Sequence, residues 1–255
     1  MENIYKFAEK LIEKASKLII KNHKNIRKIS YKGVSNLVTN VDKEVEALII
    51  KEINFRYPNH SIIAEESGLQ KKDPNYQWFI DPIDGTTNFA HSYPFFCTSI
   101  GFMKNGIMEF GLIKDPITDE LYSARRNKGS RLNEKPIFVS KTKKLHESLL
   151  ITGFPYDKKT SKMNNLKNFC NLTLLTHGVR RDGAAALDLC YIASGRADGY
   201  WELKLSPWDV AAGVLILEEA GGKVTGFKGE KYHVYKKEIV ATNGLIHKEL
   251  LKHLR

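Results

Sequence analysis

Two aspartates three residues apart, Asp81 and Asp84, have the types and spacing to do chemistry. They lie in the segment DPIDGTT, Asp81 to Thr87, directly after an apolar run that predicts a buried strand, Trp78 to Ile80. Hard cations such as Mg²⁺ prefer oxygen ligands and share them with substrate phosphates. If a helix starts at Gly85, its free backbone N–H groups would face such a phosphate. The same residues also fit an ordinary Asp/Gly turn, so the segment by itself supports both interpretations.

Further acids have comparable positions, although each also has a plain structural explanation. Glu65 and the acid after it end a predicted strand, Ser61 to Ala64, and adjacent acids on a loop are commonly just solvated. Asp42 has capping-box spacing to a threonine, and Asp209 opens an apolar helix whose dipole favours an acid. Together they place acids at strand ends and helix starts, where α/β proteins build their sites.

The elements that would position these acids alternate between helices and strands. Apolar spacing and turn residues predict helices over Glu2 to Lys21, after Thr39, and over Ser161 to Cys170, Gly183 to Ala193 and Trp208 to Ala220. They also predict an antiparallel sheet from Phe95 to Val139, a strand over Leu149 to Thr152 and an exposed loop over Leu69 to Asn75. We therefore expect the chain to divide into an N-terminal α+β half, residues 1–140, which carries the candidate metal-binding motif, and a C-terminal α/β half, residues 141–255, which would complete the site.

Composition narrows the class of protein. With 255 residues, 42% hydrophobic and 27% charged, the chain is typical of a globular protein. No apolar run approaches the roughly 20 residues of a membrane helix, and the N-terminus does not read as a secretory signal. The three cysteines are expected to be reduced and buried, and they fit neither disulfides nor a metal site. These features predict a cytoplasmic protein.

The net charge of +11 suggests a nucleic-acid partner. Much of this charge, however, is lysine spaced along amphipathic helices, and on the first helix five lysines recur at helical spacing on one solvated side. These lysines are Lys6, Lys10, Lys14, Lys17 and Lys21. The charge would also attract anionic phosphate esters towards an acidic site.

Several segments, taken together, resemble the inositol monophosphatase family of lithium-sensitive, metal-dependent phosphatases. The matching segments are LVTNVD (Leu37 to Asp42), AEESG around Glu65, WFIDPIDGTTNFAH (Trp78 to His91), RRDGAAALDLCYIASGRADGYWE (Arg180 to Glu202) and PWDVAAG (Pro207 to Gly213). Their order and spacing agree across nearly the whole chain. The resemblance implies a layered αβαβα sandwich of the sugar-phosphatase type.

The resemblance also implies a site for two to three Mg²⁺ ions. Glu65, Asp81 and the carbonyl oxygen of Ile83 would bind one ion, and Asp81, Asp84 and Asp209 a second. A third, weaker ion would lie by Glu65, where the short loop after this residue bears on ion binding.

The family's chemistry is direct attack by a metal-activated water, in line with the leaving oxygen. Glu65, Thr86 and Asp42 would be the catalytic residues, with Thr86 hydrogen-bonded to Asp42 and helping to accept the proton of the water. Arg180 or Arg181 would come from a neighbouring surface, and the family pattern implies a homodimer and inhibition by Li⁺. The expected substrate contacts are Ile83, Asp84, Gly85, Thr86, Arg180, Arg181, Gly183, Ala184, Ala185, Glu202 and Asp209.

The substrate and the class of function leave alternatives open. Inositol 1-phosphate, cleaved to inositol and phosphate, is expected first, and fructose 1,6-bisphosphate and histidinol phosphate are alternatives on the same site. A haloacid-dehalogenase-type phosphatase is disfavoured, because its motif needs an aspartate two residues before Asp84, where Pro82 stands. A protein that binds RNA or the transcription machinery is another alternative, because the chain is basic and some bacterial relatives contact that machinery.

Overall fold

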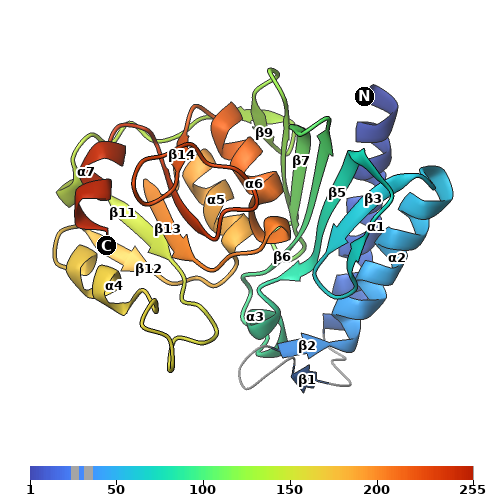
Figure 1. Ribbon diagram of the computed structural model, residues 1–255, viewed down its shortest axis with the longest axis horizontal. Helices are drawn as coiled ribbons and strands as arrows, with labels where there is room; N and C mark the ends of the chain where they lie inside the picture. The colour runs from blue at the N-terminus through green and yellow to red at the C-terminus, as the bar shows by residue number, and fades with distance from the viewer. Residues whose placement is uncertain (24–28, 32–36, 255) are drawn as a thin grey trace.

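Two large β-sheets, of eight and five strands, form the framework of the protein (Figure 1). The computed structural model describes residues 1–23, 29–31 and 37–254 of the chain. The eight-stranded sheet has the order β10-β9-β8-β7-β6-β5-β3-β4 and is antiparallel except between β3 and β5. Its strands are β3 (His60–Ala64), β4 (Gly68–Gln70), β5 (Asp73–Asp84), β6 (Cys97–Lys104), β7 (Ile107–Asp115), β8 (Glu120–Arg125), β9 (Ser130–Leu132) and β10 (Lys135–Ile137). The antiparallel sheet predicted from Phe95 to Val139 is therefore confirmed.

The five-stranded sheet has the order β12-β11-β13-β15-β14, in which β12, β11 and β13 are parallel. β15 runs antiparallel to both of its neighbours. Its strands are β11 (Leu149–Thr152), β12 (Gly178–Arg180), β13 (Gly199–Leu203), β14 (Lys223–Thr225) and β15 (Glu238–Thr242). A separate ribbon pairs β1 (Ile29–Tyr31) with β2 (Leu37–Thr39).

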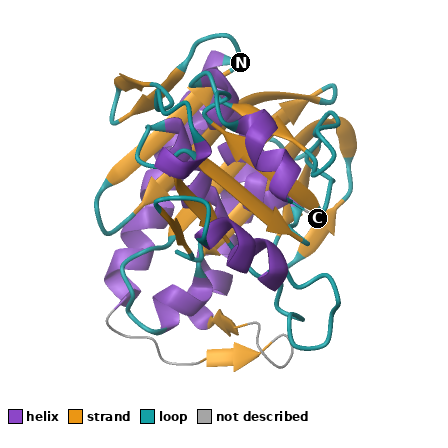
Figure 2. Ribbon diagram, turned by 90° about the vertical axis from the view of Figure 1, so that its left-hand side faces the viewer, coloured by secondary structure: helices purple, strands orange, loops and turns teal. Residues whose placement is uncertain are grey.

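Helices form layers outside and between the two sheets (Figure 1). α1 (Glu2–His23) and α2 (Asn40–Arg56) cover the outer face of the larger sheet, and α5 (Ala185–Ala193) and α6 (Pro207–Glu219) lie between the sheets. α4 (Leu166–Thr173) and α7 (His247–His253) cover the smaller sheet from outside (Figure 2). The predicted αβαβα order of layers is confirmed. Short helical turns add α3 (Thr86–Ala90) and a 3₁₀ turn at Leu145–Glu147.

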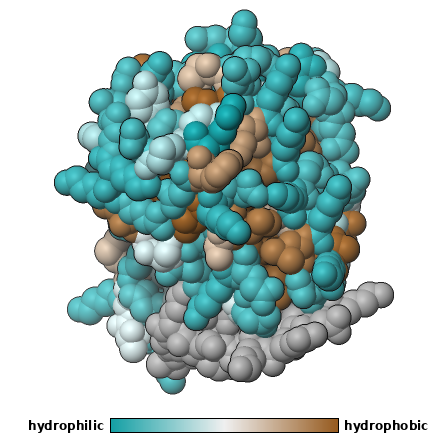
Figure 3. Space-filling view, turned by 90° about the vertical axis from the view of Figure 1, so that its right-hand side faces the viewer, coloured by the Kyte–Doolittle hydropathy of each residue, from teal (hydrophilic) through white to brown (hydrophobic). Residues whose placement is uncertain are grey.

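The burial of each helix follows from its layer. α1 is amphipathic, with Ala8, Leu11, Ala15 and Ile19 buried at helical spacing. Its five lysines named above are all exposed, and the face shown in Figure 3 is largely hydrophilic. α6 is buried along every residue from Val210 to Leu217, because sheets and α5 surround it. No helix within the described ranges is both long and apolar enough to cross a membrane.

A predicted loop, the starts of two predicted helices and one burial prediction were wrong: one of these helices, predicted from Gly183, is α5 and begins at Ala185. The stretch Leu69 to Asn75 contains part of β4 and the start of β5, since an edge strand such as β4 tolerates polar residues. The helix predicted from Ser161 begins only at Leu166. Asn165 stands before it at a φ of +69°, and its amide bonds the Gly153 carbonyl oxygen and the indole N–H of Trp201, each at 2.7 Å. Cys170 is exposed, whereas the other two cysteines are buried as predicted.

Candidate active site

β5 ends in a bulged loop that brings two aspartates out together. Asp81 and Asp84 both pair with β6, and the register shifts between them, so the intervening residues leave the ladder. Gly85 has a φ of +92°, and a Cβ there would lie 3.0 Å from the carbonyl oxygen of Phe95. The position therefore requires glycine, and the loop turns directly into α3 at Thr86.

Asp81 is the buried centre of this loop. The residue is 2% exposed, and its Oδ1 has no hydrogen-bond partner among the described residues. Burial, followed by the negative charges of Glu65, Asp84 and Asp209, raises the pKa of Asp81 well above its usual range. A buried carboxylate oxygen without a partner is unfavourable, so this environment favours a proton or a cation at Oδ1.

Asp84 and Asp209 connect the loop to the C-terminal half of the chain. Asp84 Oδ2 accepts the backbone N–H of Ala186, in the first turn of α5, at 2.6 Å. Burial and the charge of Asp209 nevertheless raise the pKa of Asp84 well above its usual range. Asp209 lies in the first turn of α6, where its Oδ2 accepts the Ser206 backbone N–H at 2.7 Å. The acid at this helix start is thus both a cap and a neighbour of Asp84.

Glu65 reaches the same place because of strand direction. It follows β3, which runs parallel to β5, and the carboxyl ends of neighbouring parallel strands meet at one edge of a sheet. The backbone N–H of Glu65 donates to the Ile80 carbonyl oxygen at 3.2 Å. This bond holds the start of the Glu65 loop against β5.

Asp42 lies behind the loop and has both roles that the sequence allowed. It accepts the Thr39 backbone N–H at 2.9 Å, which confirms the capping box of α2. Its other oxygen accepts the Thr86 hydroxyl at 2.9 Å, and that hydroxyl also lies 3.0 Å from the Ile83 carbonyl oxygen. Burial raises the pKa of Asp42.

One cavity of about 360 Å³ brings most of the predicted residues together. The predicted residues that line it are Glu65, Asp81, Ile83, Asp84, Gly85, Thr86, Arg181, Gly183, Ala185, Glu202 and Asp209. Asp42 lies behind Thr86 instead, and Ala184 is buried just before α5. Arg180 is exposed on β12 and is not one of the described residues that line the cavity.

Glu202 lines the cavity from β13. Its carboxylate accepts the Tyr200 hydroxyl, and a Cβ on Gly153 would come within 2.1 Å of Glu202 Oε1. Glycine at position 153 therefore gives the carboxylate its room. Burial raises the pKa of Glu202 to about 7, against the opposing effects of Tyr200 and Arg181.

Sequence analysis missed one wall of the cavity and one buried acid. Residues 153–157 line the cavity, and Lys204 Nζ lies 2.6 Å from Asp157 Oδ2 beside it. These residues follow β11, so the strand-end rule that found Glu65 applies to them as well.

Asp188 of α5 is 1% exposed, and its Oδ1 has no hydrogen-bond partner within the described residues. A lone acid inside an apolar helix was the available signal for Asp188.

The oxygen donors of the cavity fit a hard divalent cation. The carboxylates and the Ile83 carbonyl offer oxygen only, which favours Mg²⁺ over metals that prefer sulfur or imidazole. In the ranges that the structure describes, no three His, Cys, Asp or Glu side chains form a compact metal-binding group. Like charges repel, so a bound cation would let these carboxylates approach one another more closely. Asp81 Oδ1, which has no hydrogen-bond partner among the described residues, could be a ligand of that cation.

Comparison with known proteins points to one family. The model of the inositol monophosphatase family matches residues 1–255. An inositol-1-monophosphatase from Synechocystis is 48% identical over 227 residues, which cover 88% of this chain and 79% of that protein. The Nus factor SuhB from Vibrio cholerae is 43% identical over 258 residues, which cover 100% of this chain and 97% of that protein. A solved inositol monophosphatase structure from Anabaena (Nostoc) has a TM-score of 0.90 and 45% identity, covering 99% of this chain and 95% of that chain.

Proposed function

This chain belongs to the inositol monophosphatase family and is a phosphoric monoester hydrolase, and from that premise we propose that it hydrolyses phosphate monoesters of small polyols or sugars with Mg²⁺. Its first substrate would be myo-inositol 1-phosphate, cleaved to inositol and phosphate. The observation that carries the proposal is the single cavity in which acids from separate strands and helices surround the unpartnered Asp81 Oδ1.

The proposed cation ligands divide into two sets that share Asp81. Glu65, Asp81 and the Ile83 carbonyl oxygen would hold one Mg²⁺, and Asp81, Asp84 and Asp209 a second, with a third ion beside Glu65. When bound, the ions would lower the pKa of the attacking water and neutralise charge on the phosphate oxygens.

Thr86 and Asp42 offer a path for the proton of the attacking water. The Thr86 hydroxyl donates to Asp42 Oδ1 at 2.9 Å, so it can accept a proton from water while passing its own to Asp42. Burial raises the pKa of Asp42, which makes this carboxylate a better base. Glu65 lines the same cavity and would orient the water.

The opposite side of the cavity suits the hydroxyl groups of the departing alcohol. Glu202 is an acceptor held by Tyr200, and Arg181 lines the cavity as a donor. Gly183 has a φ of +90°, and a Cβ there would lie 2.6 Å from Arg181 Nη1, so glycine lets the guanidinium fold over the backbone. These groups, with the backbone at Gly183 to Ala185, would select a polyol or sugar.

A phosphate-release panel tests this function. Inositol 1-phosphate, fructose 1,6-bisphosphate and histidinol phosphate are each assayed with Mg²⁺ and with a chelator, and we expect the highest kcat/KM for the first. Asp84→Asn should lose the Mg²⁺-dependent activity, whereas Asp119→Asn, at a side chain 87% exposed and outside the cavity, should keep it. Full activity in Asp84→Asn would reject the cation ligands, and release from none of the esters would reject the function.

A second proposed function is association with the transcription machinery, supported by the similarity to a Nus factor over the whole chain and by the net charge of +11. Binding to labelled RNA and to RNA polymerase at moderate salt tests it, and no measurable binding would reject it. We also propose a homodimer and inhibition by Li⁺, which light scattering and a Li⁺ titration of activity would check.

A further inference from the structure

Glu46 of α2 is a buried acid that reaches the loop after Glu65 without lining the cavity. It is 3% exposed. Its Oε2 accepts the backbone N–H of Glu66 and its Oε1 accepts the backbone N–H of Ser67, each at 2.8 Å. Hydrogen bonds to a charged acceptor are shorter and stronger than neutral ones, so this carboxylate fixes two successive peptide groups.

The segment that Glu46 holds is the tight turn between β3 and β4. Ala64 pairs with Gly68 across this turn, and Gly68 has a φ of +75°. The first N–H of the turn, that of Glu65, is bound to β5 through the Ile80 carbonyl oxygen. The backbone that carries Glu65 is therefore held by β5 on one side and by α2 on the other.

The same face of α2 also holds the loop of the two aspartates. Asp42 and Glu46 are one helical turn apart, so their side chains lie on the same side of the helix. Asp42 binds the Thr86 hydroxyl, and Glu46 binds the turn after Glu65. Buried apolar residues of α2 anchor the helix in the core: Val41, Val45, Ile49 and Ile53. One anchored helix thus sets the spacing between the two loops that supply proposed cation ligands.

We propose that Glu46 is a positioning residue for the cation site: by fixing the backbone from Glu65 to Ser67, it keeps the Glu65 carboxylate directed to the cavity and sets the affinity for the divalent cation. Both oxygens of Glu46 are engaged by backbone N–H groups, so the residue acts through Glu65. This inference rests on the proposed function and adds a determinant of cation affinity that lies outside the cavity.

The test is direct cation binding by metal-free protein, measured with Mn²⁺ by electron paramagnetic resonance, together with kinetics in Mg²⁺. Glu46→Gln keeps the shape of the side chain but turns one acceptor into a donor that faces a backbone N–H. We expect its affinity for Mn²⁺ to fall roughly tenfold, as for other groups that orient metal ligands. The Mg²⁺ concentration for half-maximal activity should rise in parallel, while KM for the ester at saturating Mg²⁺ changes less than about twofold.

Two control variants separate positioning from stability. Glu44→Gln changes an acid on the same helix that bonds Asn40, and Val45→Ala removes buried volume beside Glu46; both should keep the affinity for Mn²⁺, although Val45→Ala lowers Tm. Glu46→Asp, which retains the charge but shortens the reach, should lose affinity even if Glu46→Gln folds poorly. Wild-type affinity in Glu46→Gln or Glu46→Asp, alongside weakened binding in Glu65→Gln, overturns the inference. If the wild-type protein binds no Mn²⁺, the proposed function itself fails.

Discussion

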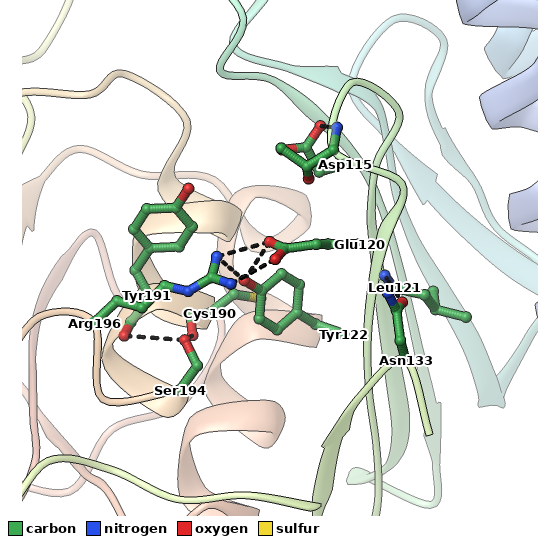
Figure 4. Close-up of polar contacts among 10 residues, drawn as sticks. Asp115, Glu120, Leu121, Tyr122, Asn133, Cys190, Tyr191, Ser194 and Arg196 are labelled. Atoms are coloured by element: carbon green, nitrogen blue, oxygen red, sulfur yellow. Dashed lines mark hydrogen bonds and ion pairs between the residues drawn. The ribbon is translucent and has the colours of Figure 1, made fainter. Parts of the chain in front are cut away.

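The charged side chains at the two ends of α5 have opposite surroundings. At its C-terminal end lies a group that we call the Arg196 cluster: Tyr191 of α5 together with Arg196, Glu120 and Tyr122 (Figure 4). Both terminal nitrogens of the Arg196 guanidinium bond the Glu120 carboxylate, one of them also bonds the Tyr122 hydroxyl at 2.7 Å, and the guanidinium lies 5.0 Å from the Tyr191 ring centroid. Every charge of the cluster has a partner supplied by the protein.

At the N-terminal end of α5, Asp84 accepts the backbone N–H of Ala186 and the Cys97 thiol, and the acids Glu65, Asp81, Glu202 and Asp209 line the same cavity. The pKa values record the difference: the Arg196 hydrogen bond lowers the pKa of Glu120, whereas burial and Asp209 raise the pKa of Asp84. A carboxylate paired with an arginine stabilises the fold and has little capacity left for a ligand. Clustered acids destabilise the fold, and a bound cation would restore that stability. The surroundings of a carboxylate therefore distinguish a structural ion pair from a ligand site.

The largest expected effect is the loss of activity on replacing Asp84, at the N-terminal end of α5. Asp84→Asn should lower kcat/KM about a thousandfold, because losing a cation ligand removes several kcal/mol of transition-state stabilisation. In chelator, the same variant should be at least as stable as the wild type, since one of the repelling charges is gone. Phosphate-release kinetics and thermal unfolding measure the two effects. If Asp84→Asn lost much stability but kept its activity, Asp84 would be a structural residue and not a cation ligand.

The opposite pattern is expected at the Arg196 cluster. Arg196→Met removes charge-assisted hydrogen bonds from a half-buried pair and should lower the free energy of unfolding by about 2 kcal/mol. Activity should stay within about twofold of the wild type at a temperature where the variant is folded. Lys144→Met, at an exposed ion pair with Glu147, is the matched control and should cost under about 1 kcal/mol in urea unfolding. Equal effects of the two variants would show that the cluster is not specially stabilising.

A smaller effect is the pH dependence that Glu202 gives to stability. Its folded pKa of about 7 lies above the value of 4.5 for a free side chain, so the folded state holds this proton longer than the unfolded state. The carboxyl therefore destabilises the fold increasingly as pH rises from about 4.5 to about 7. Glu202→Gln removes the ionisation, so its Tm relative to the wild type in chelator should rise across this window, as the difference in unfolding free energy grows by on the order of 1 kcal/mol. A constant difference in Tm from pH 4.5 to pH 8 contradicts the assignment.

The smallest expected effect concerns the partner of Glu202. Tyr200→Phe removes the hydroxyl that holds the carboxylate, and the lost hydrogen bond of about 1 kcal/mol should raise KM roughly fivefold. Because Tyr200 is not among the described residues that line the cavity, kcat and the Mg²⁺ requirement should change little. Steady-state kinetics on inositol 1-phosphate separate these parameters, and a fall in kcat with unchanged KM would place Tyr200 in a different role.

The acids of the cavity could be predicted from the sequence, whereas Glu46, which holds the loop after Glu65, could not. In the sequence pattern Asp81, Asp84 and Glu65 come after predicted strands and Asp209 opens a predicted helix. Local patterns therefore placed them at the ends of elements, and the family resemblance joined them. Glu46 resembled any other acid of an amphipathic helix, because its partners are backbone N–H groups 20 and 21 residues away.

Long-range packing explains the other misses. Gly153 is needed only because Glu202 lies 49 residues further along the chain and folds against it. Asn165 delays the start of α4 because it binds Gly153 and Trp201. Such contacts depend on the tertiary arrangement of both sheets, which no local spacing records.

The most direct test of the central claim is phosphate release from inositol 1-phosphate as Mg²⁺ is added back to chelator-treated protein. Burial and the charge of Asp209 raise the pKa of Asp84 at the N-terminal end of α5, which favours a cation there. We therefore predict no release in chelator and a saturable rise with added Mg²⁺ that Asp84→Asn abolishes. Release at the full rate in chelator, or an unchanged Mg²⁺ response in Asp84→Asn, would contradict the account.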